Sequence, residues 1–195
     1  MQTHKDNRAT VLASLGLVAT LFAGHATAES TIGLGAVESN GETGFVFSNE
    51  NTPLGRPDIA TEIYIQEIDY GTVKRTTFKG GVGLGTRLPG QIDHSLSGLI
   101  GVRADNYSQF TDEYGGYATA RYRYQAMDRI QLGADVSYTN MGTTTGTNLD
   151  VSGVTITPTV RYAFTEGVYV EGKYLNDVGD VEGYDQIVAT FRVTY

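Results

Sequence analysis

The chain has 195 residues, no cysteine and a formal net charge of −8 at pH 7. The lack of cysteine excludes a fold stabilised by disulfides, and the net negative charge argues against a nucleic-acid partner. The 25 glycines and 13 tyrosines suit β-strands joined by tight turns.

The N-terminal segment has the three parts of a secretory signal peptide. Lys5 and Arg8 give a basic start, an apolar and uncharged run follows at 11–23, and the ATA sequence at 26–28 is an A-x-A cleavage site. A membrane-anchor helix is the alternative, but it needs about 20 apolar residues and this run is shorter. We therefore expect export with cleavage after Ala28, leaving one domain at 29–195. That domain has 12 basic and 21 acidic residues, a net charge of −9.

Alternation of apolar and polar residues with period two recurs after residue 28, and no convincing 3.6-residue period is present. Two short candidate strands come first, TIGLGAVE and TGFVFSN. In chain order the clearer segments that follow are DIATEIYIQ, FKGGVGLGTRL, SLSGLIGVRA, GGYATARYRYQA, RIQLGADVSY, SGVTITPTVRYAF, VYVEGKY and DQIVATFRVTY. The sequence thus allows ten strands, or eight if 29–57 packs in another way. We favour ten.

The connections between the later segments alternate in length. PGQID, MDR and TEG are short, whereas DNYSQFTDEYG, TNMGTTTGTNLD and NDVGDVEGYD are longer and polar. Short turns at one end and long loops at the other are typical of an outer-membrane β-barrel. A secreted β-sandwich also predicts alternating strands, but with the apolar face inside and the charged face in water.

Three features favour the barrel. The segments have about 9–11 residues, the length of a membrane-crossing strand, whereas globular strands average about 5–6. The polar faces are dense in glycine, threonine and arginine, which suits a narrow lumen. The apolar faces carry aromatic residues near their ends, as in the girdles at membrane interfaces. The predicted girdle residues are Tyr122, Tyr124, Tyr162, Phe164 and Tyr195 at the short-turn end, and Phe78, Tyr138 and Tyr174 at the long-loop end.

We therefore expect an all-β, antiparallel, up-and-down transmembrane β-barrel of 8–10 strands. The chain resembles the small outer-membrane barrels of Gram-negative bacteria, of the OmpX and OmpA transmembrane-domain type, and more loosely the YfaZ-like proteins. GVGLGTRLPG, PTVRYAF and the terminal strand carry this resemblance, which covers essentially all of the chain after residue 28.

The resemblance implies a place in the outer membrane of a Gram-negative bacterium, with the lipid bilayer as surroundings. It also implies assembly by periplasmic chaperones and the outer-membrane assembly machinery. In such proteins that machinery recognises a terminal strand with alternating apolar residues and a last aromatic residue. Here Phe191 and Tyr195 take this role, although the last residue is usually Phe.

If the apolar faces meet lipid, the charged residues on the opposite faces point into the lumen. The predicted lumen charges are Lys79, Arg87, Arg103, Arg121, Arg123, Arg161, Lys173, Arg192, Glu62, Asp135 and Glu171. Buried charges need partners. Counting residues back from the turns places Arg121 level with Asp135 and predicts an Arg161–Glu171–Arg192 bridge. Two roles are open for this network. It either serves only to fill and rigidify the lumen, or its basic surplus forms a gate or a weak anion path.

Catalytic and metal-binding patterns are weak. A Ser–His hydrolase needs a histidine beside a serine, and the only histidine after residue 28 is His94, next to Ser95 at the PGQID turn. Loop carboxylates such as Asp112 and Glu113 lack EF-hand spacing. GVGLG lacks the helix and the Gly-Lys-Ser/Thr ending of a phosphate-binding loop. We expect no enzyme activity, no cofactor and no metal.

The leading functional hypothesis is a structural or surface-interaction role, with acidic loops outside and an unidentified extracellular ligand. A small channel for ions or small solutes is the alternative, and an outer-membrane enzyme is a third, weaker one. Pro158 lies inside a predicted strand, where it removes a ladder donor, and a bulge is the accommodation that we expect.

Overall fold

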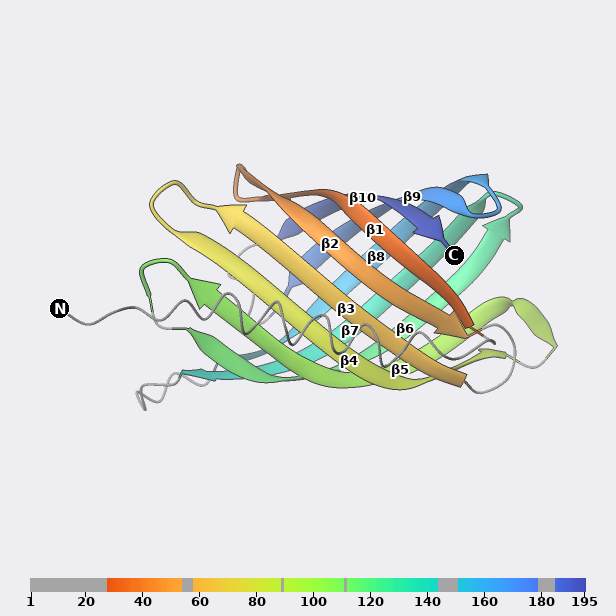
Figure 1. The fold of residues 1–195 in the computed structure, drawn as a ribbon. Helices are drawn as coiled ribbons and strands as arrows, with labels where there is room; N and C mark the ends of the chain where they lie inside the picture. Colours follow the sequence, from red (N-terminus) through yellow and green to blue (C-terminus); the bar gives the residue numbers. More distant parts are fainter. Residues whose placement is uncertain (1–27, 54–57, 89, 111, 144–150, 179–184) are drawn as a thin grey trace.

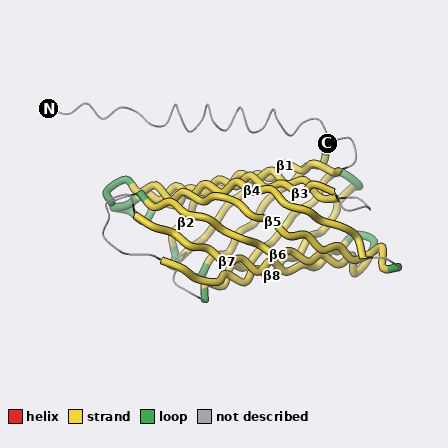
Figure 2. The backbone as a smooth tube through the Cα atoms, turned by 90° about the horizontal axis from the view of Figure 1, so that it is seen from below, coloured by secondary structure: helices red, strands yellow, loops and turns green. Residues whose placement is uncertain are grey.

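The computed structural model describes residues 28–53, 58–88, 90–110, 112–143, 151–178 and 185–195. They form a closed antiparallel barrel in which every strand pairs with its neighbours in the chain (Figures 1 and 2). The ten strands are β1 (Ala28–Ser39), β2 (Glu42–Pro53), β3 (Asp58–Asp69), β4 (Lys74–Leu88), β5 (Gln91–Tyr107), β6 (Glu113–Met127), β7 (Ile130–Thr143), β8 (Val151–Thr165), β9 (Val168–Asp177) and β10 (Gln186–Thr194).

The expected barrel and the larger of the two strand counts are confirmed. Among the described residues, no helix is long and apolar enough to cross a membrane. Apart from Ala28, which opens β1, the predicted signal peptide lies outside the described residues. Its cleavage site stays a prediction.

Period-two alternation decides which side chains enter the lumen. On β10, Val188 and Arg192 are buried, whereas Ile187 and Phe191 are exposed. The sheet closes on itself, so the buried face of each strand is the lumen face and the exposed face is the outer surface. Large apolar side chains with exposures of 37–68% cover that outer surface, among them Ile32, Leu34, Val82, Leu84, Ile100, Val102, Leu132, Val136, Ile156, Val160, Ile187 and Phe191.

Pairing of the last strand with the first closes the barrel, and β1 and β10 lie side by side in Figure 1. Ile32 is opposite Val193, so the partner of β10 is β1, the strand that contains Ile32. Two further contacts hold the last residue. The Tyr195 N–H donates to the Ser30 carbonyl at 3.0 Å, and its hydroxyl accepts a hydrogen bond from Asn49 Nδ2 at 3.1 Å.

The connections differ at the two ends of the barrel. We call the end that carries Tyr195 the turn end and the opposite one the loop end. The first two connections at the loop end, between β1 and β2 and between β3 and β4, are short, unlike the long ones predicted there between the later segments. Asn40 and Gly41 form a two-residue turn with φ of 53° and 82°, as a type I′ hairpin requires. The strands also exceed the predicted length: β5 has 17 residues and takes in part of the expected loop.

Pro158 lies on the outer face of β8 and leaves the strand register unchanged. Ile156 pairs with Asn176 and Thr159 with Lys173, which is one continuous register. Only the two intervening pairs, those of Thr157 and Pro158 with β9, are missing from the ladder. These are the pairs that need the absent proline N–H. The expected bulge is therefore wrong at this position.

The buried apolar residues gather near the loop end of the lumen. Val37, Val46, Ile68, Leu175 and Val188 form one cluster, and Tyr64 and Tyr70 pack against it. They come from β1, β2, β3, β9 and β10, on either side of the β1–β10 seam. Leu99 on β5 is also buried in the lumen.

Glycine permits close approach of neighbouring strands on the lumen side. A Cβ added at Gly83 would lie 1.8 Å from the Gly98 carbonyl oxygen, and one at Gly35 would lie 1.9 Å from the Ala189 carbonyl oxygen. Both obstacles are backbone atoms, which rotation of a side chain cannot move. These glycines let the sheet curve sharply enough to close.

We predict that Gly83→Ala lowers the free energy of unfolding of the barrel by about 1–3 kcal/mol, because the backbone of β4 or β5 must shift to make room for the added methyl group. Gly98→Ala is the matched control, since a Cβ there meets no atom within 4 Å. Urea unfolding of the refolded chain measures the difference. Equal midpoints for the two variants would contradict this explanation of Gly83.

Candidate functional site

Glu50, near the turn end of β2, is the meeting point of the lumen charges and is only 2% exposed. Its carboxylate lies 2.9 Å from Arg161 Nη2 and 3.1 Å from Arg192 Nη2. It also lies 3.3 Å from Lys173 Nζ and 3.8 Å from Arg121 Nη2. One carboxylate on β2 thus contacts cations on β6, β8, β9 and β10, across the lumen.

Glu171 on β9 is the second carboxylate of this group. It lies 2.8 Å from Arg192 Nη1 and 3.1 Å from Lys173 Nζ, and it accepts a hydrogen bond from Arg161 Nε. The Tyr169 ring lies under two of these cations, with its centroid 5.3 Å from the Arg161 guanidinium carbon and 6.0 Å from that of Arg192. The three residues of the predicted bridge therefore lie together.

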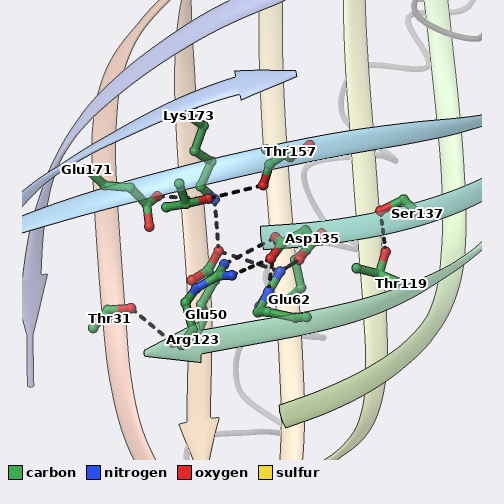
Figure 3. Close-up of polar contacts among 12 residues, drawn as sticks. Thr31, Glu50, Glu62, Thr119, Arg123, Asp135, Ser137, Thr157, Glu171 and Lys173 are labelled. Carbon is green, nitrogen blue, oxygen red and sulfur yellow. Dashed lines mark hydrogen bonds and ion pairs between the residues drawn. The ribbon is translucent and has the colours of Figure 1, made fainter. Parts of the chain in front are cut away.

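Asp135 on β7 and Glu62 on β3 are the partners of the arginines on β6. Asp135 Oδ2 lies 3.2 Å from both Arg121 Nε and Arg123 Nη2, and Arg123 Nη1 also contacts the carboxylate. Arg121 Nη2 in addition contacts Glu62. Figure 3 shows these carboxylates converging inside the barrel with Glu50 and Lys173.

We call these nine residues the central network. Its members are Glu50, Glu62, Asp135, Glu171, Arg121, Arg123, Arg161, Lys173 and Arg192. With five basic and four acidic members, it carries a surplus of one positive charge. Each member has an ion-pair partner, as buried charges require.

A second, smaller ion cluster lies nearer the loop end, on β4 and β5. Asp105 Oδ2 is 2.8 Å from both Arg75 Nη2 and Arg103 Nη2, and Asp105 Oδ1 accepts from Arg103 Nε at 3.1 Å. All three side chains are almost completely buried. Arg103 was predicted to face the lumen. Arg75 and Asp105 were missed because one predicted strand began after Arg75, at Phe78, and the other ended at Ala104, before Asp105.

Two predicted lumen cations lie apart from both groups. Arg87 is exposed at the turn end of β4, where the register shifts before Leu88, and no ion pair between described residues includes it. Among the described residues, Arg87 thus lies apart from the central network, and its part in a charge network stays a prediction. Lys79 faces the lumen, and its Nζ lies 5.7 Å from the centroid of the Tyr64 ring.

The described residues enclose two small hollows in the lumen. One, of about 60 Å³, lies on the loop-end side and is lined by Tyr64, Tyr117 and Thr139 among others. The other, of about 10 Å³, lies on the turn-end side. Glu50 and Arg121 line both hollows, so the central network lies between them. Since one water molecule needs a cavity of about 10–15 Å³, the larger hollow holds only a few waters.

Aromatic side chains lie on the outer surface near both ends. The exposed members of the predicted girdle are Tyr122, Tyr138, Tyr162, Phe164, Tyr174 and Tyr195, while Tyr124 and Phe78 are half-buried. His94 belongs with the turn-end group. Its ring stacks on Tyr124 with centroids 4.6 Å apart, and its Nδ1 lies at 2.5 Å from the Tyr122 hydroxyl oxygen.

The described residues at the loop end and at the outer face form no metal site. No group of three or more His, Asp or Glu there could hold a metal ion. Asp112 instead accepts hydrogen bonds from the Tyr107 N–H at 3.2 Å and from the Tyr114 hydroxyl. Asp185 accepts from the Tyr174 hydroxyl and from the Asp177 N–H, and these two bonds lower its pKa.

Comparison with known proteins adds little to these observations. No protein-family profile matches the chain, and no curated protein matches it. One solved structure that does match is Ail, the attachment invasion locus protein of Yersinia pestis, which is 13% identical in sequence. The match covers 86% of this chain and 96% of Ail, with a TM-score of 0.32. At this TM-score the likeness carries no argument, and the fold rests on the strand order of the chain itself.

We predict that Glu50→Gln destabilises the barrel by about 3–5 kcal/mol, because it leaves several buried cations without their shared carboxylate. The control is Glu67→Gln, which removes a carboxylate from a partly exposed pair with Lys74 and should cost no more than about 1 kcal/mol. Urea unfolding of both variants measures the effect. A Glu50→Gln midpoint equal to that of the control would show that the network contributes nothing at Glu50.

Proposed function

We propose that this chain is an integral outer-membrane β-barrel with a structural or surface-interaction role. The observation that carries the proposal is the inverted distribution of polarity. Charged side chains fill the closed lumen, while leucine, isoleucine, valine and phenylalanine cover the outside. In water this arrangement would expose a large apolar surface and bury many charges, and both are unfavourable. In a bilayer the apolar surface faces lipid and the barrel has no open edge.

The outer-surface aromatics support the same orientation in a membrane. Tyrosines and His94 at the turn end present rings with polar groups, which suit the boundary between hydrocarbon and water. The turn end would face the periplasm and the loop end the exterior, as in bacterial barrels with short periplasmic turns. The acidic residues of the loop end would then form the surface available to partners.

The terminal strand supports assembly by the outer-membrane machinery. Phe191 is 51% exposed on the outer face of β10, and Tyr195, which follows the strand directly, is 70% exposed. The proposal gives them the role of assembly signal that the resemblance to small outer-membrane barrels implies.

A small ion channel is the second candidate, because basic side chains outnumber acidic ones in the central network. Against it, the two hollows are small and the central network lies between them. The proposal therefore favours a closed lumen. Conductance in planar bilayers separates the two candidates, since steady single-channel currents would exclude the closed barrel.

The first test of membrane location is gel migration with and without boiling, together with cell fractionation. The folded barrel should migrate differently from the boiled chain and should fractionate with the outer membrane. A chain that shows no shift and stays in the soluble periplasm would contradict the proposal.

We further predict that Ile100→Arg, which places a charge on the outer face midway along β5, strongly reduces membrane insertion. Ile100 is 68% exposed, and arginine at the midplane of a barrel's lipid face costs about 2–4 kcal/mol. Gln109→Arg, in the exposed connection at the loop end, is the control and should insert normally. The yield of boil-sensitive folded protein in vesicles measures both. Equal yields would mean that Ile100 does not face hydrocarbon.

A further inference from the structure

The smaller hollow, on the turn-end side of the central network, is lined by hydrogen-bond donors and acceptors together. Arg123 contributes a guanidinium group, which only donates, and Glu50 contributes a carboxylate, which only accepts. Ser95 and Ser97 contribute hydroxyl groups, which do both. A species that fits this lining must therefore accept hydrogen bonds and also donate them.

Arg123 on β6 provides a donor that the described residues leave unused. The residue is 4% exposed. Its Nη1 donates to the Tyr122 carbonyl at 2.9 Å, and its Nη2 lies 3.2 Å from Asp135 Oδ2. The Nε–H is buried and meets no acceptor among the described residues. Because a buried donor without an acceptor is costly, we expect an acceptor beside it that the protein chain does not supply.

Glu50 on β2 provides an acceptor with capacity to spare. Its carboxylate accepts hydrogen bonds from Arg161 Nη2 at 2.9 Å and from Lys173 Nζ at 3.3 Å. A carboxylate has about four lone-pair positions, so a further donor can be accommodated. No ion pair between described residues joins Glu50 to Arg123. In the barrel, β2 and β6 are separated by three strands on one side and five on the other, so backbone pairing cannot join them.

The size of the hollow limits its occupant to one water molecule. Its volume is about 10 Å³, at the lower end of the roughly 10–15 Å³ that a water needs. A buried water typically makes about three hydrogen bonds to polar groups that would otherwise lack a partner. Arg123, Glu50 and the two serine hydroxyls offer that number, and Ser95 lies directly opposite Arg123 in the β5–β6 pairing.

The lining also argues against the other possible occupants. A halide ion is larger than a water molecule and would lie against the carboxylate of Glu50, to which it cannot donate. A metal cation cannot accept from Arg123 and would lie among guanidinium groups. An empty hollow would leave Arg123 Nε and the buried Oδ1 of Asn51, another lining residue, without partners among the described residues. A water molecule meets these demands and adds no charge.

We propose that the turn-end hollow is the binding site of one structural water molecule that joins β6 to β2 across the lumen. The water accepts a hydrogen bond from Arg123 Nε and donates one to the carboxylate of Glu50. The hydroxyl groups of Ser95 and Ser97 complete its coordination. Arg123, which holds Asp135 directly, is thereby also connected to Glu50. The site belongs to the folded barrel in detergent as in a membrane, and so it does not depend on the proposed function.

High-resolution crystallography of the refolded barrel gives the direct readout. A water peak within hydrogen-bond distance, about 2.7–3.2 Å, of both Arg123 Nε and a Glu50 carboxylate oxygen supports the proposal. A hollow without density, an ion in its place, or an Arg123 side chain that bonds Glu50 directly would overturn it.

Nuclear magnetic resonance in detergent micelles tests the same site in solution. A long-lived bound water should give a nuclear Overhauser cross-peak between the water protons and the Nε–H of Arg123. A native chain that folds but lacks this cross-peak would overturn the proposal.

Two valine variants locate the water. Ser95→Val replaces the hydroxyl by a methyl group and adds a second methyl group that would take the place of the water opposite Arg123, so the cross-peak should disappear. Ser137→Val is the control, because it makes the same change in the larger hollow, and it should keep the cross-peak. Gel migration with and without boiling shows that each variant is folded. Equal cross-peaks in the two folded variants would mean that the water lies elsewhere.

Discussion

The carboxylate of Glu50 lies where four cationic side chains from four other strands meet. These cations repel one another, and in a narrow interior with little water their repulsion is only weakly screened. A carboxylate between them turns repulsion into attraction and joins β2 to strands on the far side of the lumen. Glu171 does the same for Arg161 and Arg192 on neighbouring strands. The packing of the middle of the lumen depends on this alternation of charge.

The inner charges and the outer apolar surface are two consequences of the same alternation. Each strand sends every second side chain into the lumen and the others outward, so neither face can be changed independently of strand register. Closure between β1 and β10 removes the last free edge. The apolar cluster of Val37, Val46, Ile68, Leu175 and Val188 then fills part of the loop end. In the proposed function, the result is a barrel with a filled interior rather than an open pore.

Strand number, strand pairing and the orientation of most side chains could be predicted, because period-two alternation and short turns are local properties. The pairing of Arg121 with Asp135 also followed from counting back from a turn. Glu50 was missed because the short predicted strand TGFVFSN ended at Asn49, one residue before it. Extending the same alternation by that one residue would have placed Glu50 in the lumen. Its contacts with Arg161 and Arg192 depend on strand tilt and stagger across the barrel, which no local pattern reveals.

The chain has no tryptophan, so a single introduced tryptophan reports the surroundings of one position. The orientation of the barrel wall is tested by comparing Ile100→Trp on the outer face with Tyr117→Trp in the lumen, in vesicles of lipids brominated on their acyl chains. Bromine should quench strongly at residue 100 and little at residue 117, where the native side chain is 6% exposed. Equal quenching at the two positions, or efficient quenching of residue 100 by aqueous iodide, would contradict a barrel with its apolar face in lipid.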